Sequence, residues 1–260
     1  MTHEFKHIVE ASIDAKQNGL KSVLATVVAL DGSSYRKPGV RMLIVENDQM
    51  IGAVSGGCVE KDILRQAQSV FETGKSKMMT YDGRYRLGCE GILYILIEQF
   101  QPSEDCISAF NDTLKNRKSF YIHSNYKKEE GVFEGLGSTI QLKNNSFQLS
   151  DYKVDQTNLS VFSEQLPPCF KLIIFGAEHD AVQLCKTAHN LGWSITIVAD
   201  PDESKTLDYF PGASHLISPT FEDLDLDGID DQTAIVLMTH SFNKDIRYLL
   251  ALKETFPAYF

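Results

Sequence analysis

Apolar residues recur along the first half of the chain in short runs that alternate with amphipathic stretches. Phe5, Ile8, Val9 and Ile13 fall on one helical face, which predicts a helix over residues 4–18. Helical spacing also predicts helices over residues 59–73 and 103–117. β-Branched runs bounded by polar turns predict strands over residues 22–30, 42–46, 50–56, 77–81 and 92–100.

The pattern becomes weaker beyond residue 117. The runs YIHSNY and GVFEGLGSTIQL, with a turn at Asn144-Asn145, are typical of short strands in an exposed hairpin system. Polar residues then prevail from Ser150 to the pair Pro167-Pro168, a composition typical of a linker. We therefore expect one domain to end near residue 150.

The second half has a different periodicity, in which buried strands alternate with helices. Such alternation indicates βαβ units and a parallel sheet. The predicted strands cover residues 171–177, 194–200 and 234–240, and the predicted helices cover residues 180–190 and 243–255. The expected fold class is α/β. It comprises an N-terminal α+β domain over residues 1–150, a linker over 151–169 and a Rossmann-like parallel-sheet domain over 170–260.

Composition and charge narrow the possible functions. The chain has 260 residues, of which 43% are hydrophobic and 23% charged, as in globular proteins. A formal charge of −10 argues against a nucleic-acid or anionic-membrane surface. The chain starts without a signal-peptide pattern, and five scattered cysteines are typical of free thiols, so we expect a cytoplasmic protein. Neither cysteines nor histidines show metal-ligand spacing, and we predict no metal site.

The first turn of the Rossmann-like domain carries an altered dinucleotide fingerprint. The turn contains Gly176, Glu178 and His179, so a glutamate stands where the second glycine of GxGxxG admits a pyrophosphate. Two like charges about 4 Å apart repel by about 4 kcal/mol at an effective dielectric near 20. Asp200 ends the second strand, where an acid can accept from a ribose hydroxyl. The pattern therefore predicts a Rossmann fold and disfavours NAD(P), with an altered ligand or a lost site as alternatives.

Several motifs in this order resemble the xanthine dehydrogenase accessory factor family (XdhC/CoxI-like). They are TVVALDGSSYRKPGVRMLI, GAVSGGCVEKDI and LGCEGILYILIE, followed by a Rossmann half with FGAEH and MTH. The chain departs from the family at Glu178, where a glycine is usual. The family normally continues beyond a sequence like PAYF, so an end at Phe260 indicates a truncated or a divergent Rossmann-like domain.

The resemblance implies a molybdenum cofactor chaperone. Such a protein binds molybdopterin transiently, protects it during sulfuration and assists its insertion into a xanthine-dehydrogenase-type molybdoenzyme. The implied partners are that enzyme, a cysteine desulfurase and a second copy in a homodimer. Carried over by position, the GGC and GCEG loops would line the cofactor site with Cys58 and Cys89, next to Gly88.

The residues of these loops suit an anionic ligand with a soft metal. Gly56 and Gly57 leave the backbone bare at a helix start, where N–H groups bind anions, and the helix end favours the Cys58 thiolate. A cysteine packed in a tight turn is the alternative. Glu60 either caps the helix or acts as an acid or base, and its place in the first turn favours capping.

Two further sets of residues are candidate ligand contacts. Arg36 and Arg41 lie in a basic loop that suits a phosphate, although a solvated hairpin tip has the same composition. His179 lies at the strand edge where open α/β sheets bind ligands, although it could also cap a helix.

Three functions are consistent with these features. The first is the cofactor chaperone that the resemblance implies. The second is an NAD(P)-dependent oxidoreductase built on residues 170–260, which Glu178 disfavours. The third is an interaction module with two vestigial sites, in which the acidic stretch 199–231 docks a basic partner.

Overall fold

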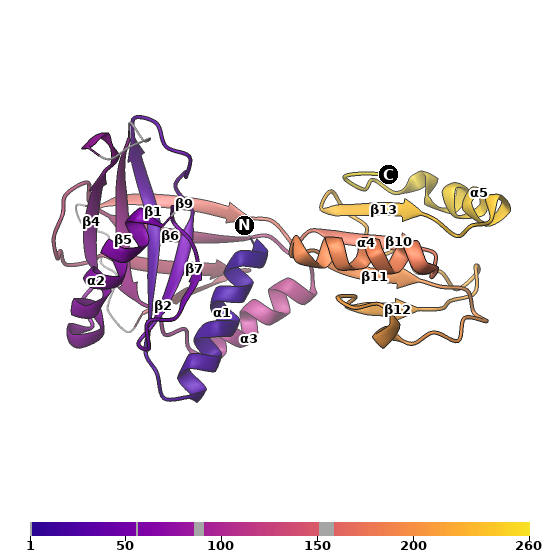
Figure 1. The fold of residues 1–260 in the computed structure, drawn as a ribbon, viewed down its shortest axis with the longest axis horizontal. Coiled ribbons are helices and arrows are strands. Elements are labelled where there is room, and N and C mark those ends of the chain that lie inside the picture. The colour runs from indigo at the N-terminus through magenta and orange to yellow at the C-terminus, as the bar shows by residue number, and fades with distance from the viewer. Residues whose placement is uncertain (1, 56, 86–90, 151–158) are drawn as a thin grey trace. The chain divides into compact units, whose positions relative to one another are not determined.

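A computed structural model describes residues 2–55, 57–85, 91–150 and 159–260, which form two compact units (Figure 1). The first unit spans Met1–Leu166 and the second Pro167–Phe260. Each unit has its own hydrophobic interior. In the described part of the chain, no helix is both long enough and apolar enough to cross a bilayer.

A five-stranded antiparallel sheet, here sheet A, organises the first unit. Its spatial order is β3-β2-β1-β5-β4. The strands are β1 (Ser22–Asp31), β2 (Arg41–Val45), β3 (Met50–Gly52), β4 (Lys77–Asp82) and β5 (Ile92–Gln99). β1 lies in the middle and is buried on both faces over most of its length, which explains its continuous apolar sequence.

Helices cover sheet A because each has one apolar face. α2 (Cys58–Thr73) buries Val59, Ile63 and Val70 against one face of the sheet. α1 (Thr2–Gln17) packs with the opposite face through Phe5 and Ile8. The helices and strands predicted over residues 4–100 are thus present, although β3 is shorter than expected.

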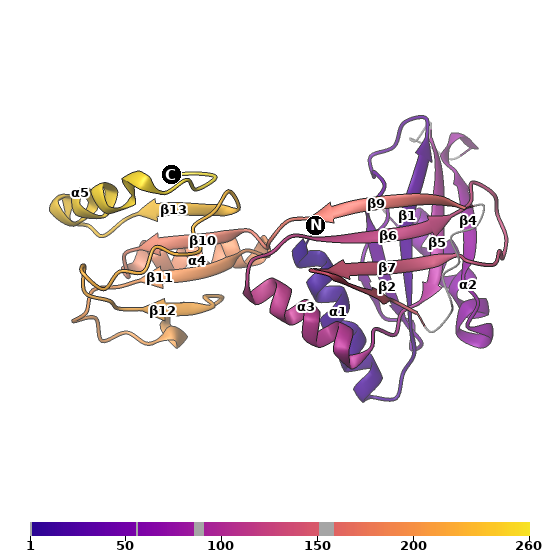
Figure 2. The same cartoon turned by 180° about the vertical axis from the view of Figure 1, so that it is seen from behind.

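A second antiparallel sheet, sheet B, packs with α1 and α3 (Glu104–Lys115) in the same unit (Figure 2). Its order is β8-β7-β6-β9. The strands are β6 (Phe120–Tyr126), β7 (Gly137–Leu142), β8 (Asn145–Gln148) and β9 (Ser160–Leu166). Phe120, Phe5, Phe100 and Phe110 form an aromatic cluster at the junction, with ring centroids 5.5–6.3 Å apart.

Sheet B corrects two expectations from the sequence. The hairpin system is not simply exposed, because Ile122, Ile140 and Leu142 are buried against sheet A. Residues 160–166 were expected in a linker but form β9, which pairs with β6 along its whole length. The polar side chains of β9 lie mostly on an accessible face of sheet B, so its sequence resembles that of a linker.

The second unit is a half-Rossmann domain with a four-stranded parallel sheet in the order β12-β11-β10-β13. The strands are β10 (Lys171–Phe175), β11 (Ser194–Val198), β12 (His215–Ile217) and β13 (Thr233–Leu237). The helices are α4 (His179–Asn190) and α5 (Phe242–Ala251), with short 3₁₀ turns η2 (Leu207–Tyr209) and η3 (Leu252–Glu254). This arrangement confirms the predicted fold class. The sequence did not predict β12, which has three residues.

Candidate functional site

Three motif-bearing connections meet one end of sheet A. β1 runs toward this end and β2 leaves from it, so residues 32–40 connect them there. β4 ends and β5 begins at the same end, because Asp82 pairs with Ile92, and the 3₁₀ turn η1 (Gly83–Tyr85) follows β4 directly. β3 also ends here, and residues 53–57 lead from it into α2. We call this end the motif end.

Gly57 at the start of α2 has a backbone conformation that only glycine adopts readily. Its φ is 115°, and it is the N-cap of the 16-residue helix. An added Cβ would meet nothing within 4 Å, so the glycine serves the turn rather than close packing. Gly57 is exposed, and Cys58 follows as the first helical residue. Among the described residues, none beyond its chain neighbours therefore comes close to Gly57 at this helix N-terminus, and helix N-termini attract anions.

Glu60 is a capping residue of this turn. Its carboxylate accepts hydrogen bonds from the backbone N–H groups of Ser55, at 2.6 Å, and Gly57, at 2.8 Å, and from the Ser55 hydroxyl, at 2.7 Å. Burial raises the pKa of Glu60, but these hydrogen bonds to the charged form outweigh burial and leave the pKa below its ordinary value. Glu60 therefore remains ionised and fixes the conformation of the glycine turn.

The connections that carry the GSS and GCEG motifs touch each other at the motif end. An added Cβ at Gly91 would lie 2.5 Å from the backbone oxygen of Ser33, so only glycine fits there. The Gly83 N–H donates to the Gly91 carbonyl at 3.0 Å and closes the base of the 83–91 connection. Gly56, Gly88 and Cys89 lie outside the described residues, as does the side chain of Cys58.

The charges at the motif end are unevenly compensated. Arg84 forms a bidentate pair with Asp82, with N–O distances of 2.6 and 2.9 Å. Arg36 and Lys37 are exposed, and neighbouring Tyr35 is 91% exposed. Arg36 also interacts electrostatically with Glu4 of α1, and this interaction contributes to lowering the pKa of Glu4. The predicted basic loop therefore presents two positive charges to an incoming anion.

Arg41 does not join Arg36 in the exposed loop, contrary to expectation. Its side chain is only 4% exposed, and its Nη1 lies 2.6 Å from Glu164 Oε2. The guanidinium also lies over the Phe5 ring, 5.7 Å from the centroid. Arg41 is the first residue of β2, where alternation turns its side chain toward sheet B. It therefore belongs to the interior rather than to a surface that meets phosphate.

The Rossmann turn of the second unit is tightly packed. Gly176 has φ 132°, and an added Cβ would lie 2.3 Å from the Met238 carbonyl oxygen, so the position requires glycine. Glu178 is the exposed N-cap of α4 and makes no side-chain capping bond, and His179 is the exposed first residue of that helix. The glutamate thus stands at the helix end that a pyrophosphate would approach, as the sequence predicted.

Ion pairs occupy the rest of this sheet edge. The Asp200 carboxylate, expected to accept from a ribose, is paired with Lys244 of α5, which raises the pKa of the lysine. Asp180 and His240 are 2.8 Å apart, and their hydrogen bond raises the pKa of the histidine and lowers that of the aspartate. No group of three or more potential metal ligands occurs among the described residues.

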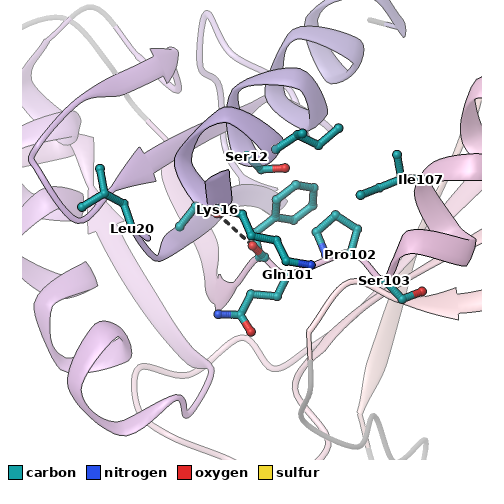
Figure 3. Close-up of a pocket in the computed structure, with 10 residues that line it drawn as sticks. Ser12, Lys16, Leu20, Gln101, Pro102, Ser103 and Ile107 are labelled. Carbon is teal, nitrogen blue, oxygen red and sulfur yellow. Dashed lines mark hydrogen bonds between the residues drawn. The ribbon is translucent and has the colours of Figure 1, made fainter. Parts of the chain in front are cut away.

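A separate pocket of about 290 Å³ opens between α1 and the β5–α3 connection (Figure 3). Two of its hydroxyls donate to backbone carbonyls, Ser12 to Val9 at 2.7 Å and Ser22 to Phe100 at 2.8 Å, and the Ser103 hydroxyl accepts from the Cys106 N–H at 3.2 Å. Lys16 extends across the opening toward Pro102. None of the motif residues lines this pocket.

Sequence reasoning missed Glu98, a fully buried carboxylate on β5. It accepts hydrogen bonds from the Ser138 N–H at 2.8 Å and the Ser138 hydroxyl at 2.5 Å. Strand alternation carried the signal, because position 98 shares a face with the apolar residues Leu96 and Phe100.

The fold and motif end define a two-unit α/β protein in which a sheet-rich N-terminal unit precedes a half-Rossmann unit. Two family models match the chain: the XdhC and CoxI family over residues 15–82, and the XdhC Rossmann domain over residues 172–260. The chain belongs to the XdhC and CoxI family. The matches include the β1–β2 connection, the glycine turn and all of the parallel sheet except Lys171.

Individual relatives agree with this assignment. A probable xanthine dehydrogenase subunit of Bacillus subtilis (strain 168) is 29% identical over 250 residues, which cover 86% of this chain and 74% of that protein. The molybdenum cofactor insertion chaperone PaoD of Escherichia coli (strain K12) is 23% identical over 264 residues, covering 100% of this chain and 72% of that protein. A crystal structure of a xanthine dehydrogenase from Bacillus halodurans has a TM-score of 0.73 and 24% identity, covering 96% of this chain and 86% of that one, which shows a shared fold.

Proposed function

We propose that this protein is an accessory factor that binds the molybdenum cofactor transiently and assists its sulfuration and insertion into a xanthine-dehydrogenase-type molybdoenzyme. The observation that carries this proposal is the arrangement of the motif end, where three motif-bearing connections meet. The name of the relative PaoD, a molybdenum cofactor insertion chaperone, supports the same function.

The motif end offers the kinds of group that this cargo requires. Molybdopterin has a phosphate, a flat pterin and a metal bound by sulfur. The α2 N-terminus carries the positive end of the helix dipole, which attracts a phosphate. The Gly57 N–H already donates to Glu60 and the Val59 N–H to the Ser55 hydroxyl, at 3.4 Å, so the phosphate would meet the other N–H groups of the first turn. Arg36 and Lys37 add positive charge. Cys58 at the helix start is suited to the thiolate form, which binds soft metals.

The proposal includes the second cysteine loop and the partners. Cys89, flanked by Gly88, belongs to the connection whose described end, Gly91, touches the Ser33 backbone. We propose that Cys58 and Cys89 face the metal or its sulfur. The proposed partners are the recipient molybdoenzyme, a cysteine desulfurase that supplies sulfur, and a second copy in a homodimer. We place the protein in the cytoplasm, where such an exchange with a soluble enzyme would occur.

The second unit has a different part in this proposal. Glu178 stands at the N-terminus of α4, and Asp200 is paired with Lys244, so the edge that binds NAD(P) in related folds is occupied by the chain's own charges. We therefore propose that the cofactor binds at the motif end and that NAD(P) is not a ligand.

Cofactor retention by cysteine variants tests this function. Wild type, Cys58→Ser and Cys89→Ser would be mixed with molybdenum cofactor, and the bound pterin quantified by fluorescence after release and oxidation. Each variant should retain about 10- to 150-fold less cofactor, because removal of one charged contact costs about 1.5–3 kcal/mol. Cys169→Ser is the matched control, because Cys169 lies at the start of the second unit. Equal retention by all four proteins would contradict the thiol contact, and no retention by wild type would contradict the function.

A further inference from the structure

The motif between β1 and β2 consists of two parts with different surroundings. Its first part, through Lys37, is largely exposed. Its second part turns inward, because Gly39 and Arg41 are both buried. Glu164, which contacts both of these residues, is 123 positions further along the chain than Arg41, on β9 of sheet B.

Gly39 has a bare Cα against the Glu164 carboxylate. An added Cβ would lie 3.0 Å from both carboxylate oxygens and from the carbon that bears them. The φ of Gly39 is 101°, a conformation that also favours glycine. Its N–H donates to the Val27 carbonyl at 2.8 Å, so the residue is fixed to β1. The lack of a Cβ thus lets the loop backbone approach the carboxylate, and the hydrogen bond to Val27 holds it there.

Arg41 joins the same carboxylate to the same glycine. Its Nη1 donates to the Gly39 carbonyl at 2.9 Å and to Glu164 Oε2 at 2.6 Å. Glu164 is 25% exposed and Arg41 only 4%, and Glu164 is the carboxylate that is hydrogen-bonded to the guanidinium, while buried Glu98 interacts with Arg41 electrostatically. Removing the carboxylate's charge would therefore loosen the end of the loop at the point where β2 begins.

We propose that Glu164 is a positioning residue that holds the β1–β2 connection, so that Ser33, Ser34 and Arg36 are presented at the motif end. The role in cofactor binding rests on the proposed function, whereas the role in fixing the loop does not. In this view Gly39 and Arg41 anchor the motif, and its exposed serines and basic residues contact the ligand. Strand β9, which sequence analysis placed in a linker, becomes part of the site's support.

Trypsin provides a direct measure of how firmly the loop is held. The bond after Arg36 is a tryptic site in an exposed loop, whereas the bond after Lys37 precedes a proline and resists cleavage. Glu164→Gln keeps the shape of the side chain and removes its charge. Because a charged hydrogen bond that holds the loop is lost, cleavage after Arg36 should accelerate at least about tenfold. Cleavage at other sites should keep its wild-type rate.

Glu129→Gln is the matched control, because Glu129 forms an exposed pair with Lys127, at 2.6 Å, in the same unit. It should digest like wild type. Glu164→Asp, which keeps the charge but shortens the side chain, should show an intermediate rate. An unchanged rate after Arg36 in folded Glu164→Gln, or an equal acceleration at all sites, would overturn the positioning role.

Binding of molybdenum cofactor by the same variants separates this inference from the proposed function. Glu164→Gln should bind the cofactor several-fold more weakly than wild type and Glu129→Gln. If the wild type binds no cofactor while cleavage after Arg36 accelerates in Glu164→Gln, the proposed function fails and the loop anchor stands. If cofactor binds equally to all three proteins, Glu164 does not position the ligand-binding part of the loop.

Discussion

Replacing Glu98 by glutamine should change how the stability of the protein depends on pH. Burial raises the pKa of Glu98 to about 7, while hydrogen bonds from Ser138 and the charge of Arg41 partly oppose this rise. The folded protein therefore keeps the proton on Glu98 over a pH range in which the unfolded chain has already released it. The variant lacks this proton and should lose the corresponding pH dependence.

The direction and the size of this pH dependence follow from the pKa of Glu98 in the unfolded chain, 4.5, and in the folded protein, about 7. Below about pH 4.5 both states are protonated and the contribution of Glu98 to stability is complete. As pH rises toward 7 the unfolded state releases its proton and stability falls, by about 1.4 kcal/mol per pH unit. The total loss is on the order of 3 kcal/mol, and it levels off above pH 7.

Glutamine suits this position because its amide can satisfy the same neighbours. Its oxygen would accept from the Ser138 N–H, and its NH₂ would donate to the Ser138 hydroxyl, which then donates to Ser124, 2.7 Å away. Urea unfolding at pH 5 and pH 8 would measure the effect. Relative to wild type, Glu98→Gln should gain about 2–3 kcal/mol at pH 8 compared with pH 5. Glu134→Gln, at an exposed position, should show no such gain. If stability falls by the same amount from pH 5 to pH 8 in wild type and in Glu98→Gln, the reasoning is refuted.

Two further predictions concern glycine and nucleotide sites. Gly176→Ala should destabilise the second unit by about 2–4 kcal/mol, because the added Cβ would clash with the Met238 carbonyl. Gly19→Ala, at φ 72° with nothing within 4 Å of the added Cβ, should lower the free energy of unfolding by only about 1 kcal/mol. Equal losses of stability in thermal unfolding of the two variants would contradict this account. Calorimetric titration with NAD or NADP should give no binding heat, because Glu178 is the N-cap of α4, where a phosphate would bind, and Asp200 is ion-paired. Micromolar affinity would instead support an oxidoreductase.

Periodicity was sufficient to predict the helices and strands with strong apolar patterns. It predicted the parallel sheet of the second unit because buried strands such as β10 are continuously apolar. The sequence did not predict β9 because it is an edge strand of sheet B, paired only with β6, and few of its side chains are apolar. Three-residue β12 is too short to show a period.

The candidate site could be predicted only in part, because spacing does not reveal burial. Arg36 and Arg41 look equivalent in the motif, yet only Arg41 lies at a strand position that faces the interior. The partner that decides this, Glu164, is far away in sequence and was expected in a linker. The capping role of Glu60 was easier to predict, because a glutamate three residues after a helix N-cap is a signal within the local sequence.

Hydrogen–deuterium exchange with and without molybdenum cofactor tests the central claim, that the connections at the motif end form one ligand site. Binding should slow exchange together in residues 32–40, 53–60 and 83–91, and should leave the exposed edge of the second unit around residues 178–180 and 240–244 unchanged. Protection confined to the second unit, or none in the presence of saturating cofactor, would contradict the claim.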